Sequence, residues 1–398
     1  MQDDVNKDKE KYRKYTVIHP NDIAINGLNL NYDFVSQRVA SVKNKGIMTS
    51  AYLFFTPRRI EEQKYLIYLL KGYDGIKLFH GIGSGLRQTL TADEVLKLQL
   101  PVPPKPEQDQ IVRYLDWKTS EIDRFIHQKK KQIKRLEEYK FTRMDELVTK
   151  GLDKTVPMKD SEVEWLGYVP AHWNVHTIKQ HFQIRKRIAG REGFDVLSIT
   201  QQGLKVKDIA SNEGQMAQNY SGYQFVYPGD FAMNHMDLIT GYVDLSDKFG
   251  VTSPDYRVFS LVDTENCYPE FYLRVFQIGY KRRTFYKFGK GAANQGRWRL
   301  PQRAFYNYSI QVPPIEEQVA IEKECVVLEK QADEMIDALH KEIELLQELR
   351  TKIIADVVTG QIDVRDEIIP EYNNTEDIEP DDELENEDDS EEESEAEE

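Results

Sequence analysis

The sequence contains an internal repeat, in which residues 102–153 return as residues 312–363. The offset between matching positions stays at 210, from a shared Val-Pro-Pro at the start of each copy to a shared aspartate at its end. A repeat of this length is typical of a structural unit that is used more than once. We therefore expect the chain to fold as two copies of one unit rather than as a single continuous domain.

Each copy of the repeat predicts a long helix. After the opening prolines, which suit the first turn of a helix, each copy runs for about 40 residues without proline or glycine. Apolar residues recur at alternating spacings of four and three, the pattern of a coiled-coil seam. We expect the two helices to pair as an antiparallel coiled coil; the alternative is that each packs on its own globular domain. The seam residues are Ile122, Ile126, Ile133, Leu136, Leu147, Ala332, Ile336, Leu339, Ile343, Leu346, Ile353 and Val357.

The segments before the two helices are related more weakly and predict two globular modules of mixed α/β type. Short alternating runs such as Tyr256–Leu261 predict strands, and the runs Ile60–Leu70 and Glu270–Tyr280 predict helices. The second module has many more residues ahead of the shared positions, so we expect the first module to be incomplete. The fold class is therefore α+β, divided into a partial first module (1–101), a spacer helix (102–153), a second module (154–311), a second spacer helix (312–365) and a disordered acidic tail (366–398).

Charge is distributed unevenly along the chain. The net charge is −15, but residues 366–398 contain 19 acidic residues and no basic ones, so the rest of the chain carries +4. We expect this tail to be disordered and solubilising, with mimicry of DNA as the alternative. The chain has only two cysteines, no apolar run that spans a bilayer and no signal peptide at its start. A cytoplasmic protein without a membrane partner is expected.

Catalytic motifs are not found in the sequence. No phosphate-binding GxxxxGK[ST] loop, Asn/Asp-Pro-Pro-Tyr/Phe methyltransferase signature or PD…(D/E)xK nuclease core occurs. His172, His176 and His181 lie close together, but no neighbouring cysteine or carboxylate completes a tetrahedral metal site. We therefore expect no catalytic residues, no metal and no cofactor in this chain.

A basic stretch predicts a nucleic-acid contact in the second module. Residues 271–315 contain nine basic residues and no acidic one, with aromatic and amide side chains between them. Lys and Arg neutralise phosphates, whereas Arg, Asn and Gln read base edges; the alternative is an ordinary solvated basic face. The candidate DNA-binding residues are Arg274, Lys281, Arg282, Arg283, Lys287, Lys290, Asn294, Gln295, Arg297 and Arg299, with Arg87 as the first-module counterpart of Arg297.

Three features together resemble a known family. Residues 158–173 (MKDSEVEWLGYVPAHW) are similar to the entry motif of a target-recognition domain. The Pro-Pro-x-x-Glu-Gln junctions at 103–108 and 313–318, and the long helices ending near Val-Thr, are similar to the conserved spacers of the same family. The family is that of specificity subunits of type I restriction-modification systems, and by this resemblance the chain is N-terminally shortened.

The resemblance implies a non-catalytic reader of double-stranded DNA. In the family, two target-recognition domains each read half of a bipartite site, and the paired helices bind two modification subunits, which a restriction subunit can join. Methylation and cleavage, with S-adenosylmethionine, ATP and Mg²⁺, belong to those partners. The alternative for this chain is a coiled-coil interaction or scaffold protein without specific DNA binding.

Overall fold

The computed structural model describes residues 12, 15–85, 88–208, 217, 219–239, 241–291 and 298–372. The chain divides into two compact units, one formed by residues 1–133 and 337–398 and the other by residues 134–336. Each unit therefore contains part of both long helices. Within the described ranges, no helix combines the length and the apolar composition needed to span a bilayer. Beyond residue 372 the predicted acidic tail lies outside these ranges. The disorder expected for it therefore stays a prediction.

The first unit contains a small antiparallel sheet covered by a helix. Its strands run in the order β3-β2-β5, and β1 pairs separately with β4. The core contains Ile23, Ile25, Leu69 and Phe79, which are all buried. The elements are β1 (Tyr15–Ile18), β2 (Ile23–Ile25), β3 (Val39–Ser41), β4 (Gly46–Thr49), β5 (Leu53–Phe55), η2 (Ile60–Glu62), α2 (Gln63–Gly75), α3 (Leu78–Ile82) and α4 (Ala92–Leu96).

Two glycines allow α2 to pack closely against the end of the second long helix, α9 (Ile315–Val358). A Cβ atom added at Gly72 would lie 2.5 Å from Val358 Cγ2, and one added at Gly75 would lie 2.7 Å from Thr351 Cγ2. Both distances are too short for carbon atoms in contact. The sequence of α2 therefore places its smallest residues where the two helix backbones approach each other.

The second unit has a larger sheet with an aromatic core. The strand order is β14-β13-β16-β9, all antiparallel, and Phe182, Phe231, Phe259 and Phe276 meet on one face in edge-to-face and stacked contacts. Pairs β12–β15, β10–β11, β17–β8 and β6–β7 complete the strands. The elements are β6 (Met158–Asp160), β7 (Tyr168–Pro170), β8 (Asn174–Thr177), α6 (Ile178–His181), β9 (Phe182–Arg185), β10 (Leu197–Thr200), β11 (Gly203–Val206), β12 (Gln224–Val226), β13 (Phe231–Met233), β14 (Val243–Leu245), β15 (Gly250–Thr252), β16 (Arg257–Leu261), α7 (Pro269–Lys281), η3 (Thr284–Phe288), α8 (Gln302–Tyr306) and β17 (Ser309–Val312).

The two units repeat one topology. Order β3-β2-β5 in the first unit corresponds to β14-β13-β16 in the second, and the β1–β4 pair corresponds to β12–β15. Helix α2 corresponds to α7, and each is followed by a residue with left-handed backbone, Lys77 (φ 61°) and Arg283 (φ 55°). In the second unit, β9 adds a fourth strand beside β16. The weak sequence similarity between the modules therefore reflects a shared fold.

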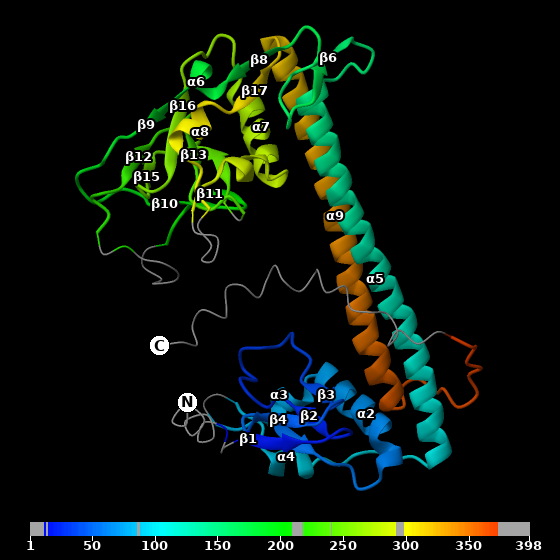
Figure 1. Ribbon diagram of the computed structural model, residues 1–398. Coiled ribbons are helices and arrows are strands. Elements are labelled where there is room, and N and C mark those ends of the chain that lie inside the picture. The colour runs from blue at the N-terminus through cyan, green and yellow to red at the C-terminus, as the bar shows by residue number, and fades with distance from the viewer. Residues whose placement is uncertain are drawn as a thin grey trace, which may run out of the picture. The chain divides into compact units, whose positions relative to one another are not determined.

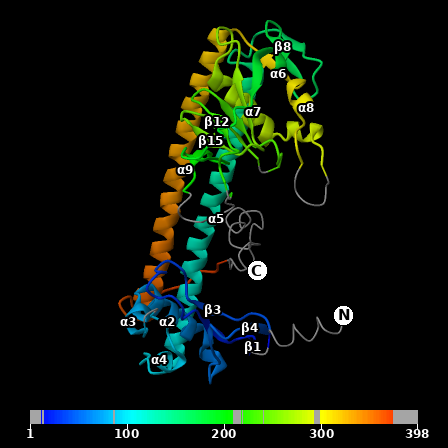
Figure 2. The ribbon, with the colours of Figure 1, turned by 90° about the vertical axis from the view of Figure 1, so that its left-hand side faces the viewer.

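The long helices α5 (Lys105–Lys150) and α9 begin in the same way. In each repeat the glutamine of the Glu-Gln pair bonds back to the proline that precedes the helix: Gln108 Nε2 donates to Pro103 O (2.9 Å), and Gln318 Nε2 to Pro313 O (2.8 Å). This contact fixes the angle at which the chain enters the helix. Both long helices are visible in Figure 1, and a second view is given in Figure 2.

Within each unit, ion pairs join the local parts of α5 and α9. In the first unit, Asp123 pairs with Arg350 (2.9 Å) and Lys129 with Glu342 (2.5 Å); in the second, Lys140 pairs with Asp333 (2.6 Å). Within the first unit, residue numbers rise along α5 from Asp123 to Lys129 while those of their partners fall along α9 from Arg350 to Glu342. All twelve apolar residues of the predicted seam are buried or partly buried.

Candidate nucleic-acid interface

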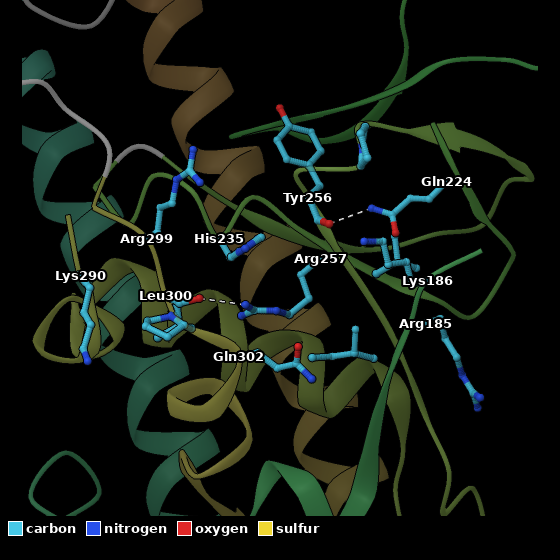
Figure 3. Close-up of a pocket in the computed structure, with 14 residues that line it drawn as sticks. Arg185, Lys186, Gln224, His235, Tyr256, Arg257, Lys290, Arg299, Leu300 and Gln302 are labelled. Carbon is cyan, nitrogen blue, oxygen red and sulfur yellow. Dashed lines mark hydrogen bonds between the residues drawn. The ribbon is translucent and has the colours of Figure 1, made fainter. Parts of the chain in front are cut away.

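A cavity of about 480 Å³ opens at one side of the sheet in the second unit (Figure 3). The β9–β16 ladder places Arg185 opposite Val258, so that the end of β9 and the start of β16 form one wall. The opposite wall comes from the chain between η3 and the first residue of α8. Its fourteen lining residues include five cations, Arg185, Lys186, Arg257, Lys290 and Arg299, and no carboxylate.

Arg257 lies at the base of this cavity and is only 6 % exposed. Its Nη2 donates to the carbonyl oxygen of Leu300 (2.8 Å), and its guanidinium lies 4.7 Å from the centre of the Phe305 ring. Nη1 is buried and has no hydrogen-bond partner among the described residues. Burial lowers the pKa of Arg257 to about 10, so the side chain is still charged at neutral pH. A buried cation with an unused donor favours an anionic or hydrogen-bond-accepting ligand.

His235 lies beside Arg257 and is neutral at physiological pH. Burial, followed by the positive charges of Arg257 and Arg299, lowers its pKa to about 3. Its Nδ1 is also buried without a partner in the described part of the chain. The cavity therefore combines fixed positive charge with a neutral imidazole, and the latter can donate or accept one hydrogen bond depending on its tautomer.

A hairpin forms the rim of the cavity. Lys290 N donates to Arg299 O (2.8 Å) and Arg299 N to Lys290 O (3.1 Å), which closes the base of the loop between them. Leu300 N then donates to His235 O (2.9 Å) and anchors the hairpin to the chain after β13. Lys290 and Arg299 are both exposed. The predicted DNA-binding residues Asn294, Gln295 and Arg297 belong to this loop but lie outside the described residues.

The first unit has an equivalent hairpin. Ser84 N donates to Thr89 O (3.2 Å) and Thr89 N to Ser84 O (2.9 Å), while Leu90 N donates to Gly27 O (2.8 Å), as Leu300 does to His235. The loop between the paired positions is shorter than in the second unit by four residues. By sequence Arg87 belongs to this loop, but it lies outside the described residues.

Other predicted DNA-binding residues lie away from the cavity and have partners within the fold. The Arg274 guanidinium is bound by Glu322 (3.3 Å) and Glu329 (2.7 Å) of α9, and its side chain is 15 % exposed. Arg282 pairs with Asp145 (3.2 Å), and Lys287 pairs with Glu164. Lys281 lies over the ring of Phe141, and Arg283 is exposed. The basic stretch is therefore not one surface: only Lys290 and Arg299 of the described candidates line the cavity.

Sequence reasoning missed seven polar residues of the cavity. Gln302 lies within the basic stretch but was not singled out, and the other six lie upstream of it: Arg185, Lys186, Gln224, His235, Tyr256 and Arg257. One signal was available for Arg257, since a charged residue opens the otherwise apolar strand Arg257–Leu261 and strands of this kind rarely bury an unpaired cation without a reason. The others can be found only from the sheet pairing.

Comparison with known proteins shows which proteins the chain resembles. Residues 5–135 match the family described as "Type I restriction modification DNA specificity domain". The chain is 24 % identical over 376 residues to the type I restriction enzyme MjaVIII specificity subunit of Methanocaldococcus jannaschii, covering 88 % of this chain and 81 % of that protein. A second relative, the putative MjaX specificity subunit of the same organism, is 24 % identical over 318 residues (76 % and 69 % covered). The chain is therefore similar to type I specificity subunits over most of its length.

A solved structure extends the similarity to the fold. It comes from work on complex assembly and conformational transition of the type I restriction-modification system, and it aligns with a TM-score of 0.52 at 13 % identity, over 88 % of this chain and 85 % of that one. The mixed α/β fold with two long helices is thus shared with a protein of this system. Type I specificity subunits are not enzymes themselves, since other subunits of the system carry the catalysis, and DNA sequence recognition is their role.

Proposed function

We propose that this chain is a type I specificity subunit and reads a bipartite site on double-stranded DNA, with the cavity of the second unit at one of the two DNA contacts. The observation that carries the proposal is the cavity itself, with five cations and no carboxylate. Phosphate neutralisation requires such unpaired cations, and base edges in the major groove are read best by arginine and amide side chains. Gln224, Gln302 and Tyr256 supply polar and aromatic groups in the same place.

The second half of the site is assigned to the first unit. The equivalent hairpin at Ser84 and Thr89 supports this assignment, because it projects its loop from the same position of the repeated topology. Arg87, in that loop, remains the proposed counterpart of Arg297. Two similar modules with loops of different length and sequence suit two different half-sites.

The helices α5 and α9 are proposed to pair as an antiparallel coiled coil and to bind the partner subunits. Burial of the seam and three ion pairs between the helices support the pairing. Large apolar residues on the outer faces support partner binding, because exposed apolar side chains that recur along a helix mark interaction surfaces. They are Phe125, Tyr139, Val326, Val327, Met335, Leu345 and Leu349. The proposed partners are two modification subunits and a restriction subunit, which would use S-adenosylmethionine, ATP and Mg²⁺.

Salt-titrated DNA binding tests the role of the cavity. The full chain in complex with its modification subunit is measured against duplexes that contain the recognised sequence. Lys290→Ala and Arg299→Ala are each expected to reduce the slope of log K against log salt by about 0.9, the value for one lost phosphate contact. Lys248→Ala removes the same charge from an exposed turn outside the cavity and is the matched control.

Two outcomes would contradict the proposal. One is that the DNA affinity of the unmodified chain does not change with salt concentration, which would argue against phosphate contacts and favour a scaffold without specific DNA binding. The other is that all three variants show the same salt dependence. The cavity would then not be part of the DNA interface, and another surface would have to bind the DNA.

A further inference from the structure

The second unit contains a cluster of metal-binding side chains that the DNA-reading role does not use. His181 Nδ1, an oxygen of Asp263 and Cys267 Sγ all lie within 4.8 Å of one another. His181 is the last residue of α6, and the other two lie within the loop between β16 and α7. The end of the β9–β16 ladder brings them together, because Val262 N donates to His181 O (2.9 Å) just beyond the last paired strand residues.

We propose that His181, Asp263 and Cys267 bind one Zn²⁺ ion, which pins the β16–α7 loop to α6. A thiolate, an imidazole and a carboxylate form a mixed set that suits zinc better than Mg²⁺ or Ca²⁺, since those ions prefer all-oxygen sites. A water would take the fourth position, because the Asp263 side chain is 30 % exposed and borders solvent. Three protein ligands and a water form a known zinc arrangement.

The distances already approach those of a zinc site. Zn–N and Zn–S bonds of about 2.0 and 2.3 Å at a tetrahedral angle place the two ligand atoms roughly 3.5 Å apart. In the structure, His181 Nδ1 lies 3.4 Å from Cys267 Sγ and 3.6 Å from Asp263 Oδ2. The remaining pair of ligand atoms, on Asp263 and Cys267, lies within 4.8 Å, so binding would draw these two side chains closer together.

Neighbouring residues orient the proposed ligands. His176 Nδ1 lies 2.8 Å from His181 Nε2, with the two rings nearly parallel. If Nε2–H of His181 donates this bond, Nδ1 is left unprotonated and available to a metal, the usual tautomer of a ligating histidine. The side-chain amide and backbone N–H of Asn266 both donate to Asp263 Oδ1 (3.1 Å each) and hold that carboxylate in place.

Tyr272 provides an independent sign that a thiolate belongs here. Its hydroxyl is fully buried on α7 and has no hydrogen-bond partner among the described residues. Tyr272 and Cys267 pack in the same core cluster of the second unit. A neutral thiol is a weak acceptor, whereas a zinc-bound thiolate would accept the Tyr272 O–H and satisfy it.

The sequence alone did not identify this set. The three histidines His172, His176 and His181 were considered as ligands and rejected, because no cysteine or carboxylate lies near them in the sequence. The missing groups come from a loop more than eighty residues downstream. In the structure His176 is placed behind His181, and His172 instead bonds to Glu317 (2.6 Å).

Metal analysis of the purified full chain tests the proposal. Protein made with zinc in the medium is expected to carry one Zn²⁺ per chain by elemental mass spectrometry. Asp263→Asn and Cys267→Ala should lose it, whereas Cys325→Ala should retain it and serves as the matched control, because Cys325 is an equally buried cysteine in the same core. Co²⁺ should replace the ion and give a thiolate-to-cobalt absorption band that the Cys267 variant lacks.

A change in the neighbouring residue separates ligation from simple packing. His176→Ala is expected to weaken Zn²⁺ affinity by about 10- to 100-fold, the range for loss of a residue that orients a metal ligand. The proposal is overturned if the unmodified chain carries no metal and its melting temperature does not change between added Zn²⁺ and a chelator. The cluster would then be a thiol–imidazole hydrogen bond. Asp263→Asn is partly exposed and conservative, so its metal content is informative even if the cysteine variant fails to fold.

Discussion

At the scale of single residues, Arg274 is a structural cation. Two glutamates of α9 surround its guanidinium, and one of them, Glu322, is buried enough that its pKa is raised to about 7 despite the arginine. Removing one partner from a buried ion pair leaves an uncompensated charge in a poorly solvated site. The position of Arg274 in a basic stretch therefore does not indicate that it contacts DNA.

Arg274→Ala is expected to lower the free energy of unfolding by about 3–5 kcal/mol. Lys330→Ala on α9, the helix that carries Glu322 and Glu329, is the control, since Lys330 and Glu334 form an exposed pair whose loss costs about 0–1 kcal/mol. Chemical denaturation of the two variants measures the difference. Equal stability of both would show that the Arg274 cluster is not held as the structure has it.

His235 predicts a specific pH dependence. Because burial lowers its pKa to about 3 in the folded chain while the unfolded value is about 6.5, only the unfolded chain gains this proton as pH falls between those values. This group therefore stabilises the fold above pH 6.5 and destabilises it progressively below. His235→Gln should become more stable relative to the unmodified chain as pH falls, by up to about 1.4 kcal/mol per pH unit. A difference that is constant with pH would contradict burial of a neutral imidazole.

At the scale of elements, the seam of α5 and α9 can be tested by two neighbouring residues. Ile343 is 8 % exposed, and Leu345, two positions along the same helix, is 53 % exposed. Ile343→Ala should lower the free energy of unfolding by about 2–5 kcal/mol, whereas Leu345→Ala should change it by less than about 0.5 kcal/mol. Urea denaturation distinguishes the two. Similar small losses at both positions would mean that the helices are not packed along this seam.

The long helices were predictable because they depend on local sequence. Uninterrupted runs after Pro104 and Pro314 predicted helices that the structure has at Lys105–Lys150 and Ile315–Val358, since the residues that decide a helix lie three and four positions apart. The helix predicted at Glu270–Tyr280 is present as Pro269–Lys281 for the same reason. Local spacing also predicted a seam along α5 and α9, and its twelve residues are buried or partly buried.

The cavity and the zinc cluster depend instead on which strands pair. Arg185 and Arg257 meet only because β9 and β16 are neighbours in the sheet, and no local pattern indicates that pairing. Glu322 and Glu329, which form ion pairs with Arg274, likewise come from a different helix. Composition correctly indicated a basic segment, but the partners of each cation are decided by tertiary contacts.

At the scale of the whole molecule, the repeat predicts how DNA spacing depends on helix length. The chain passes from the first module through α5 to the second module, and α9 follows with a matched length. Inserting seven residues into each helix keeps the seam in register and lengthens each by about 10 Å. The gap between the two half-sites should then grow by about 3 base pairs, at roughly 3.4 Å per pair. Methylation mapping of the variant measures this gap. An unchanged gap would show that helix length does not set the spacing between the two half-sites.

The most direct measurement is the DNA methylation pattern of cells that express this chain together with its modification subunit, read at single-base resolution. Two modules that read two half-sites predict a modified motif in two short defined parts, separated by a fixed number of unspecified base pairs, which disappears when the chain is deleted. A continuous motif, or a pattern that does not depend on the chain, would contradict the account.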